Sequence, residues 1–300
     1  MNIVEVHHLK KYYGKHRGVE DVDFHIKEGE IFGFIGPNGA GKSTTIRCAL
    51  SLIFPTEGSI SIFGLDSIKD KVEIARHVGY LPSEVAYYEN MKVKDLLAYS
   101  MSFYGSTDPK RLKNLTERMD LDINRKIDDL SLGNKKKVGI VQGLLQRPKL
   151  IILDEPTSGL DPLMQQRFFD LIEEENAQGA TVLFSSHILS EVKRLSSRIA
   201  LIKDGRIEDM NQIANLQKNH YKNVRLTADP AALDQFEQSS MIDVKDRFTN
   251  ELHFQYRGEI NLLLRELAQF DVHNLSMEDP TLEELFMEYY VRPSDEHPSS

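Results

Sequence analysis

The chain has 300 residues, 40% of them hydrophobic, which is enough for two domains with separate cores. Its formal net charge of −9 argues against nucleic-acid binding through a broad basic surface. A single cysteine, Cys48, excludes an internal disulfide and suits a reducing compartment. We find no signal-peptide pattern and no apolar run near the ~20 residues that span a bilayer, so we expect a soluble protein that reaches a membrane only through a partner.

A glycine-rich loop is the first chemical signal. It follows an apolar run of strand type at 29–35 and precedes a predicted helix at 44–54. This context favours phosphate binding by the pattern G-x-x-x-x-G-K-[ST], in which backbone N–H groups and the positive helix end hold phosphate oxygens. Lys42 would reach the β- and γ-phosphates, and the Ser43 hydroxyl would bind Mg²⁺. The predicted loop comprises Gly36, Pro37, Asn38, Gly39, Ala40, Gly41, Lys42, Ser43 and Thr44.

Residues 85–130 show the apolar spacing of helices. Apolar residues recur at helical spacing in KVKDLLAYSMSFYG and in DPKRLKNLTERMDL, which predicts a helical subdomain inserted into the core. The basic run Lys135–Lys137 follows this region. We interpret it as a solvated helix face without a partner.

An acidic pair follows the next apolar run, in KLIILDEPTSGLDP at 149–162. A buried parallel strand delivers side chains to a ligand at its carboxyl end, and here those side chains are Asp154 and Glu155. Asp154 is placed to hold Mg²⁺, and Glu155 to polarise an attacking water.

Residues 199–210 predict two strands joined by a turn, and the polar stretch 211–220 predicts a linker helix. Six further segments follow in the order strand, helix, strand, strand, helix, strand, which is the ferredoxin-like βαββαβ order. His253 and His273 stand apart from each other there, and we interpret both as structural. Because no catalytic pattern occurs in this part, a dimer-stabilising or regulatory role is the default.

The order of four segments, GPNGAGKST, LSLGNKKKVGI, IILDEPTSGLDP and LFSSHILSEV, resembles the ATP-binding subunit of an ABC transporter. The segments LSLGNKKK, YLPSE and PTLEELFMEYY are similar to the bacterial exporter branch for drugs and antimicrobial peptides, including bacitracin-type exporters. The resemblance implies an α/β P-loop NTPase core with an antiparallel β subdomain and an inserted helical subdomain. The expected parts are a nucleotide-binding domain at 1–215 with its helical subdomain at about 85–145, an accessory domain at 216–291, and a disordered tail at 292–300.

The same resemblance implies ATP and Mg²⁺ as cofactors and ATP hydrolysis coupled to transport. The implied partners are a polytopic membrane subunit, which holds the chain at the cytoplasmic face of the bacterial membrane, and a second nucleotide-binding subunit, identical or paralogous. Lys42, Glu155 and His187 form the implied catalytic set, with His187 at the γ-phosphate. Tyr13 would stack on adenine, unless it is only an aromatic residue at a strand end.

The resemblance further implies a shared site. Ser131 and Gly133 would open a signature helix that closes over the ATP of the partner, and Asp161 would lie in a loop that crosses between subunits. The signature reads LSLGN instead of LSGGQ, so Leu132 replaces a glycine. In GYLPSE, Ser83 replaces the expected glutamine, and Glu84 beside it either coordinates Mg²⁺ or is simply exposed.

The stretch AYYENM at 86–91 places Tyr87, Tyr88 and Met91 either in a surface for the membrane subunit or in packing within the helical subdomain. The leading function is the ATPase of an exporter. The alternatives are an ABC-type ATPase that acts mechanically on DNA or ribosomes and a nucleotide-gated regulatory module. The chain lacks the second cassette or long coiled coil of the former, and Glu155 argues against the latter.

Overall fold

The computed structural model describes the whole chain except residues 88–89, 104–107, 213–220, 281–283 and 285–300. It has two compact units, Met1–Gln212 and Ile213–Ser300. No helix within the described residues has the length and apolar character needed to cross a bilayer. The predicted tail at 292–300 lies outside the described part.

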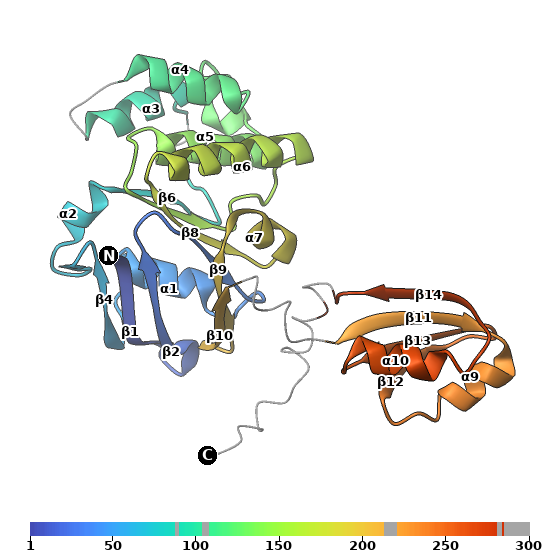
Figure 1. Ribbon diagram of the computed structural model, residues 1–300. Helices are drawn as coiled ribbons and strands as arrows, with labels where there is room; N and C mark the ends of the chain where they lie inside the picture. The colour runs from blue at the N-terminus through green and yellow to red at the C-terminus, as the bar shows by residue number, and fades with distance from the viewer. Residues whose placement is uncertain (88–89, 104–107, 213–220, 281–283, 285–300) are drawn as a thin grey trace. The chain divides into compact units, whose positions relative to one another are not determined.

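One ten-stranded sheet organises the first unit, in the order β5-β4-β1-β2-β10-β9-β3-β8-β7-β6 (Figure 1). Strands β9, β3, β8, β7 and β6 are parallel, whereas β5, β4, β1 and β2 form an antiparallel part. The strands are β1 (Asn2–Tyr13), β2 (His16–Lys27), β3 (Ile31–Ile35), β4 (Glu57–Ile62), β5 (Leu65–Asp66), β6 (Val78–Leu81), β7 (Leu150–Asp154), β8 (Thr181–Ser186), β9 (Arg198–Lys203) and β10 (Arg206–Gln212).

The parallel strands place the functional residues. Every residue of β3, β7 and β8 is buried, as expected for strands that are covered on both faces. Because parallel strands all end at the same edge, the segments that follow them meet there. The carboxyl ends of β3, β7, β8 and β6 therefore bring together the glycine loop, the acidic pair, His187 and Ser83.

Helices cover the sheet and form the predicted inserted subdomain. Figure 1 shows α3 and α4 together beyond α5, away from β1 and β2. The helices of this unit are α1 (Lys42–Ala49), α2 (Lys71–Ala75), α3 (Val93–Ser102), α4 (Pro109–Arg118), α5 (Leu132–Leu144), α6 (Pro162–Ala177) and α7 (Leu189–Leu195), with a short 3₁₀ turn at Ile127–Asp129.

Two predicted helices differ in the structure. The helix predicted at 44–54 ends at Ala49, because Ser51 adopts a left-handed φ of 52° and the N–H of Leu52 turns back to the carbonyl of Arg47. The predicted linker helix at 211–220 begins as strand instead. Residues 211–212 pair with β9 as the end of β10, and the remainder lies outside the described residues.

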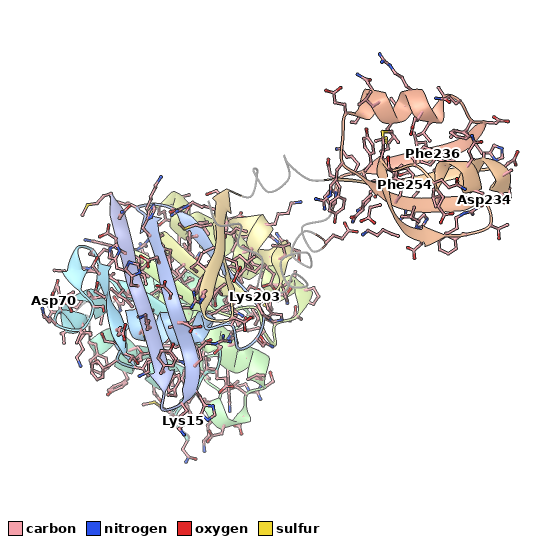
Figure 2. The ribbon with its side chains drawn as sticks, turned by 90° about the horizontal axis from the view of Figure 1, so that it is seen from below. Lys15, Asp70, Lys203, Asp234, Phe236 and Phe254 are labelled. Carbon is pink, nitrogen blue, oxygen red and sulfur yellow. The ribbon has the colours of Figure 1, made fainter. Side chains whose placement is uncertain are left out.

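The second unit has the ferredoxin-like topology that the sequence predicts. Its sheet is antiparallel with the order β12-β13-β11-β14, and α9 and α10 pack on one face. Figure 2 labels Phe236 and Phe254, whose ring centroids lie 5.4 Å apart in this core. Of the segment PTLEELFMEYY at 280–290, only Pro280 and Glu284 are described. The elements are β11 (Lys222–Ala228), α9 (Pro230–Phe236), β12 (Ile242–Arg247), β13 (Glu251–Tyr256), α10 (Ile260–Leu267) and β14 (Val272–Glu278).

Candidate functional site

The glycine loop joins β3 to α1. Gly36 has no room for a side chain, since a Cβ there would lie 2.3 Å from the carbonyl oxygen of Ile202. Gly41 has a φ of 112° and precedes the first turn of α1, which no side chain caps. The first N–H groups of a helix then remain available to an anion. Pro37, Asn38 and Gly39 form the exposed tip of the loop, and Ala40 is buried.

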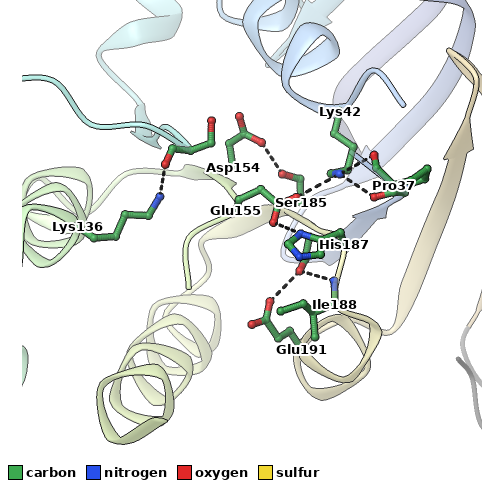
Figure 3. A network of polar contacts seen from close by, with 12 residues as sticks. Pro37, Lys42, Lys136, Asp154, Glu155, Ser185, His187, Ile188 and Glu191 are labelled. Carbon is green, nitrogen blue, oxygen red and sulfur yellow. Dashed lines mark hydrogen bonds and ion pairs between the residues drawn. The ribbon is translucent and has the colours of Figure 1, made fainter. Parts of the chain in front are cut away.

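Lys42 points back into the loop. Its Nζ donates hydrogen bonds to the carbonyl oxygens of Gly36 at 2.7 Å and Pro37 at 3.1 Å (Figure 3). It also lies 3.1 Å from Oε1 of Glu155, an ion pair that lacks hydrogen-bond geometry. Ser43 and Thr44, the next two hydroxyl residues, are half-buried. The ammonium thus stands between the glycine loop and the acidic pair.

Asp154 ends β7 and is fully buried. Its Oδ1 accepts a hydrogen bond of 2.8 Å from Oγ of Ser185, while its Oδ2 is buried without a partner in the described part of the chain. A buried carboxylate oxygen without a donor is costly unless a ligand completes its shell. Asp154 therefore fits the predicted Mg²⁺ ligand.

Each carboxylate oxygen of Glu155 contacts a nitrogen of another side chain, Lys42 or His187. His187 Nδ1 is 2.6 Å from Oε2 of Glu155, and Lys42 contacts the other carboxylate oxygen (Figure 3). The backbone after β8 is fixed by Ser186, whose Oγ donates to Glu191 at 2.8 Å and accepts from the N–H of Ile188 at 2.9 Å. The structure thus brings the predicted catalytic residues Lys42, Glu155 and His187 into one contact network.

Tyr13 ends β1 and is 45% exposed. A Cβ on Gly18 would lie 2.9 Å from Cε2 of Tyr13 and 3.0 Å from Cγ2 of Thr44. Because Gly18 has no side chain, the ring of Tyr13 can lie close to the end of the glycine loop. Lys11 stacks over the ring with Nζ 5.2 Å from its centroid. An exposed aromatic face beside the phosphate loop suits a nucleobase.

The remaining predicted site residues gather elsewhere. Ser131, Gly133 and Asp161 line a hollow of about 700 Å³ that contains no residue of the glycine loop. Ser131 caps α5 by accepting from the N–H of Asn134 at 3.3 Å, and Asp161 caps α6 by accepting from Met164 at 3.0 Å. A lining without residues of the glycine loop is consistent with the expectation that Ser131, Gly133 and Asp161 act on the nucleotide of a second subunit.

Gly133 also has a role within the chain. A Cβ there would lie 2.5 Å from the carbonyl oxygen of Gly159, so the start of α5 packs directly on the loop that leads to Asp161. Leu132, which replaces the expected glycine, is 64% exposed at the same place.

The basic run on α5 is not a solvated face, so that interpretation was wrong. Lys136 and Lys137 are 1% and 8% exposed, and Lys135 is half-buried. Lys136 donates from Nζ to the carbonyl oxygens of Pro82 at 3.0 Å and Ser83 at 2.8 Å. Burial lowers the pKa of Lys136 to about 8. Sequence reasoning missed this residue.

An apolar groove of about 780 Å³ borders the same segment. Tyr87 lines it, yet its hydroxyl donates to the carbonyl oxygen of Lys135 at 3.2 Å, and burial raises its pKa above the ordinary range. Met91 is half-buried, Glu84 is exposed, and Tyr88 lies outside the described residues. Other apolar lining residues are Leu50, Leu52, Val85, Leu96, Tyr99 and Phe103.

These groups fit a nucleotide with its metal. An uncapped helix start and glycine loop match anionic oxygens, and the unpartnered oxygen of Asp154 matches a cation. Ser43 and Asp154 could hold that cation between them and the phosphates.

The chain is similar in sequence to one family model and to named transport proteins, and similar in structure to a solved protein. The family model described as ABC transporter matches residues 19–158. The bacitracin transport ATP-binding protein BcrA of Bacillus licheniformis is 33% identical over 300 residues, covering 95% of this chain and 96% of the relative. The lantibiotic transport ATP-binding protein SrtF of Streptococcus pyogenes is 35% identical over 206 residues, covering 68% and 89%. The solved dimeric ATP-binding cassette MJ0796, in a post-hydrolysis state with ADP and Pi, has a TM-score of 0.65 at 25% identity, covering 70% of this chain and 98% of that one.

Proposed function

Since this chain belongs to the ABC transporter family, as an ATP-binding and ATP-hydrolysing subunit, we propose that it powers the export of drugs or antimicrobial peptides. The cargo class is supported by the two relatives named for bacitracin and lantibiotic transport. The observation that carries the proposal is the contact network of Lys42, Glu155 and His187 beside the glycine loop.

The residues of the network divide the chemistry of hydrolysis. The ammonium of Lys42 would exchange its two loop carbonyls for phosphate oxygens and balance the charge that develops there. Glu155 would orient the attacking water, with its carboxylate held in place by His187. Ser43 and Asp154, with Glu84 as a third candidate ligand, would hold Mg²⁺, which would supply further positive charge to the phosphates.

A second nucleotide-binding subunit would complete each site. The hollow at Ser131, Gly133 and Asp161 presents a helix N-terminus that suits the phosphates bound by another chain. ATP would then join two subunits, and its hydrolysis would release them. The dimeric state of the solved cassette bound to ADP and Pi supports this arrangement.

A membrane subunit would bind at the apolar groove beside Ser83. Residues of α3, α5 and the segment after β6 line the groove. An occupant would therefore touch the segment that leaves the sheet beside Asp154. Apolar and aromatic lining residues such as Leu52, Tyr99 and Phe103 suit a protein interface. Attachment to the cytoplasmic face of the membrane would follow from this contact. A polytopic membrane protein that copurifies with the chain would support transport, whereas its absence would favour a mechanochemical or regulatory ATPase.

The substitution Glu155→Gln tests the mechanism. The amide cannot polarise water, so we expect phosphate release to fall by ~10² to 10⁴, and the protein to accumulate as an ATP-bound dimer on size exclusion. Glu173→Gln, which removes an exposed carboxylate from α6, is the control and should retain wild-type turnover. Normal phosphate release by Glu155→Gln would rule out the assigned role.

A further inference from the structure

A buried cation that the proposed mechanism does not use lies on α5. The side chain of Lys136 is almost completely buried, which is rare for lysine unless its charge is partnered. Its described hydrogen-bond partners are two backbone carbonyl oxygens, at 3.0 Å and 2.8 Å, and no carboxylate contacts it in the described part of the chain. Figure 3 draws one of these two contacts. The charges of Asp154 and Glu155 nevertheless favour its protonated form.

Those carbonyls belong to the segment that follows β6. Pro82 and Ser83 follow β6, in which Leu81 pairs with Leu153, the residue before Asp154. The segment therefore leaves the sheet beside the buried carboxylate. The described hydrogen bonds to this segment come from Lys136, and both are made to backbone carbonyl oxygens of the segment. The short hydroxyl side chain of Ser83 takes no part in them.

The position of Lys136 along α5 gives this contact a second consequence. The helix begins with Ser131 as its cap and with Gly133 in the hollow proposed for the partner's nucleotide. Lys136 lies five residues after the cap, about one and a half helical turns, on the same rigid element. One helix thus contacts both the hollow and the segment beside Asp154.

We propose that Lys136 is a positioning residue that fastens the Pro82–Ser83 segment to α5, so that the site for the chain's own nucleotide and the hollow for the partner's nucleotide move as one body. The inference rests on the proposed function of the shared site. We attribute the connection between α5 and the Pro82–Ser83 segment to the hydrogen bonds that Lys136 donates and not to its charge, because both contacts of the ammonium are to neutral carbonyls.

Three variants of the full chain test the proposal. Lys136→Met fills the same space without a donor, and Lys136→Gln keeps an N–H donor without the charge. Lys135→Met is the matched control, since it removes a half-buried lysine from the same helix, and no contact of its side chain to the Pro82–Ser83 segment is described. The measurements are kcat and KM for Mg-ATP hydrolysis and the rise in Tm caused by ATP.

We expect Lys136→Met to lower kcat about tenfold to a hundredfold, as misplacement of about 1 Å does, while KM and the ATP-induced rise in Tm stay within about twofold. Lys136→Gln should recover kcat to within about fivefold of wild type, because the amide still donates to the carbonyls. If Lys136→Met does not fold, the kcat of Lys136→Gln alone decides whether the proposal holds.

A kcat of Lys136→Met within twofold of wild type would overturn the proposal, as would a folded Lys136→Gln that loses more than about tenfold. In both cases hydrolysis by the wild type would still support the proposed function. A wild-type chain without hydrolysis would contradict the proposed function itself.

Discussion

The backbone conformation of Glu155 is unusual, and several contacts fix the position of its side chain. Its φ of 49° is left-handed, a region that residues other than glycine adopt rarely and only where several contacts fix them. Its N–H donates to the carbonyl of Ser185 at 3.1 Å, and its two carboxylate oxygens meet Lys42 and His187. The backbone of Glu155 is therefore fixed by the neighbouring strand β8. Its side chain is held by His187, which follows β8, and by Lys42, which follows β3 on the far side of β8.

The burial of Lys136 predicts a pH dependence of stability. Its pKa is lowered from 10.5 to about 8 in the folded chain, so between these values the unfolded chain binds more protons. The contribution of Lys136 to the free energy of unfolding then rises with pH. We expect the difference in this free energy, wild type minus Lys136→Met, to become more positive from about pH 7.5 to about pH 9.5 in urea denaturation. A difference that stays flat or falls would contradict the lowered pKa.

Most of the site residues could be predicted because each follows a strand or lies in a glycine loop. Lys42, Asp154 and Glu155 needed only their local pattern. Ser185 could not be found this way, since its partner Asp154 lies 31 residues away. Lys136 contacts Ser83 across 53 residues, but a signal existed: it shares the i, i+4 stripe with the buried Ile140.

At the level of elements, the start of α5 depends on close backbone packing. A methyl group on Gly133 would lie 2.5 Å from the carbonyl of Gly159 and would push helix and loop apart. We expect Gly133→Ala to lower kcat by about tenfold or more. ATP binding, measured by the nucleotide-induced rise in Tm, should persist because the glycine loop belongs to other elements.

Gly143→Ala provides the matched control on the same helix. Its Cβ would meet the carbonyl of Tyr80 at 3.6 Å, an ordinary contact. Alanine also favours the helix by up to about 1 kcal/mol, so this variant should melt no lower than wild type and keep its basal turnover. Equal loss of turnover in both glycine variants would show that α5 tolerates no added methyl group, and would remove the special role of Gly133.

Element boundaries were harder to predict than element order. The apolar pattern continues past Ala49, and only the left-handed turn at Ser51 ends α1. Likewise the polar residues 211–212 carry no strand pattern, yet they pair with Ile199 and Arg198 of β9. Both outcomes depend on backbone hydrogen bonds to specific partners, which residue type does not determine.

At the scale of the molecule, the described residues form separate hydrophobic cores in the two units, and these two cores share no residue. Each core is built from its own sheet and helices, so we expect the first unit to fold alone. A chain that ends at Gln212 should show the same ATP-induced rise in Tm as the full chain. Loss of that shift would mean that the second unit supports the nucleotide site. A steeper dependence of turnover on protein concentration would instead assign the second unit to dimerisation.

A mixing experiment distinguishes a shared site from a self-contained one. Lys42→Ala removes the phosphate-binding ammonium of a chain, and Ser131→Arg blocks its hollow; we expect each variant alone to hydrolyse little ATP. In a mixed dimer, the intact loop of the Ser131→Arg chain would face the intact hollow of the Lys42→Ala chain. Random pairing should restore up to about a quarter of wild-type turnover, since about half the dimers are mixed and each has one complete site.

If each hollow served the loop of its own chain, no mixture could restore activity, because every chain would carry one defect in its only site. A mixture that stays inactive, although both variants fold by thermal melt, would therefore contradict the dimeric arrangement. Lys42→Ala mixed with Lys42→Arg is the negative control, because both variants alter the same half of the site. Restoration that depends on the ratio of the two chains, with its maximum near equal amounts, would follow from pairing between subunits and from no property of either chain alone.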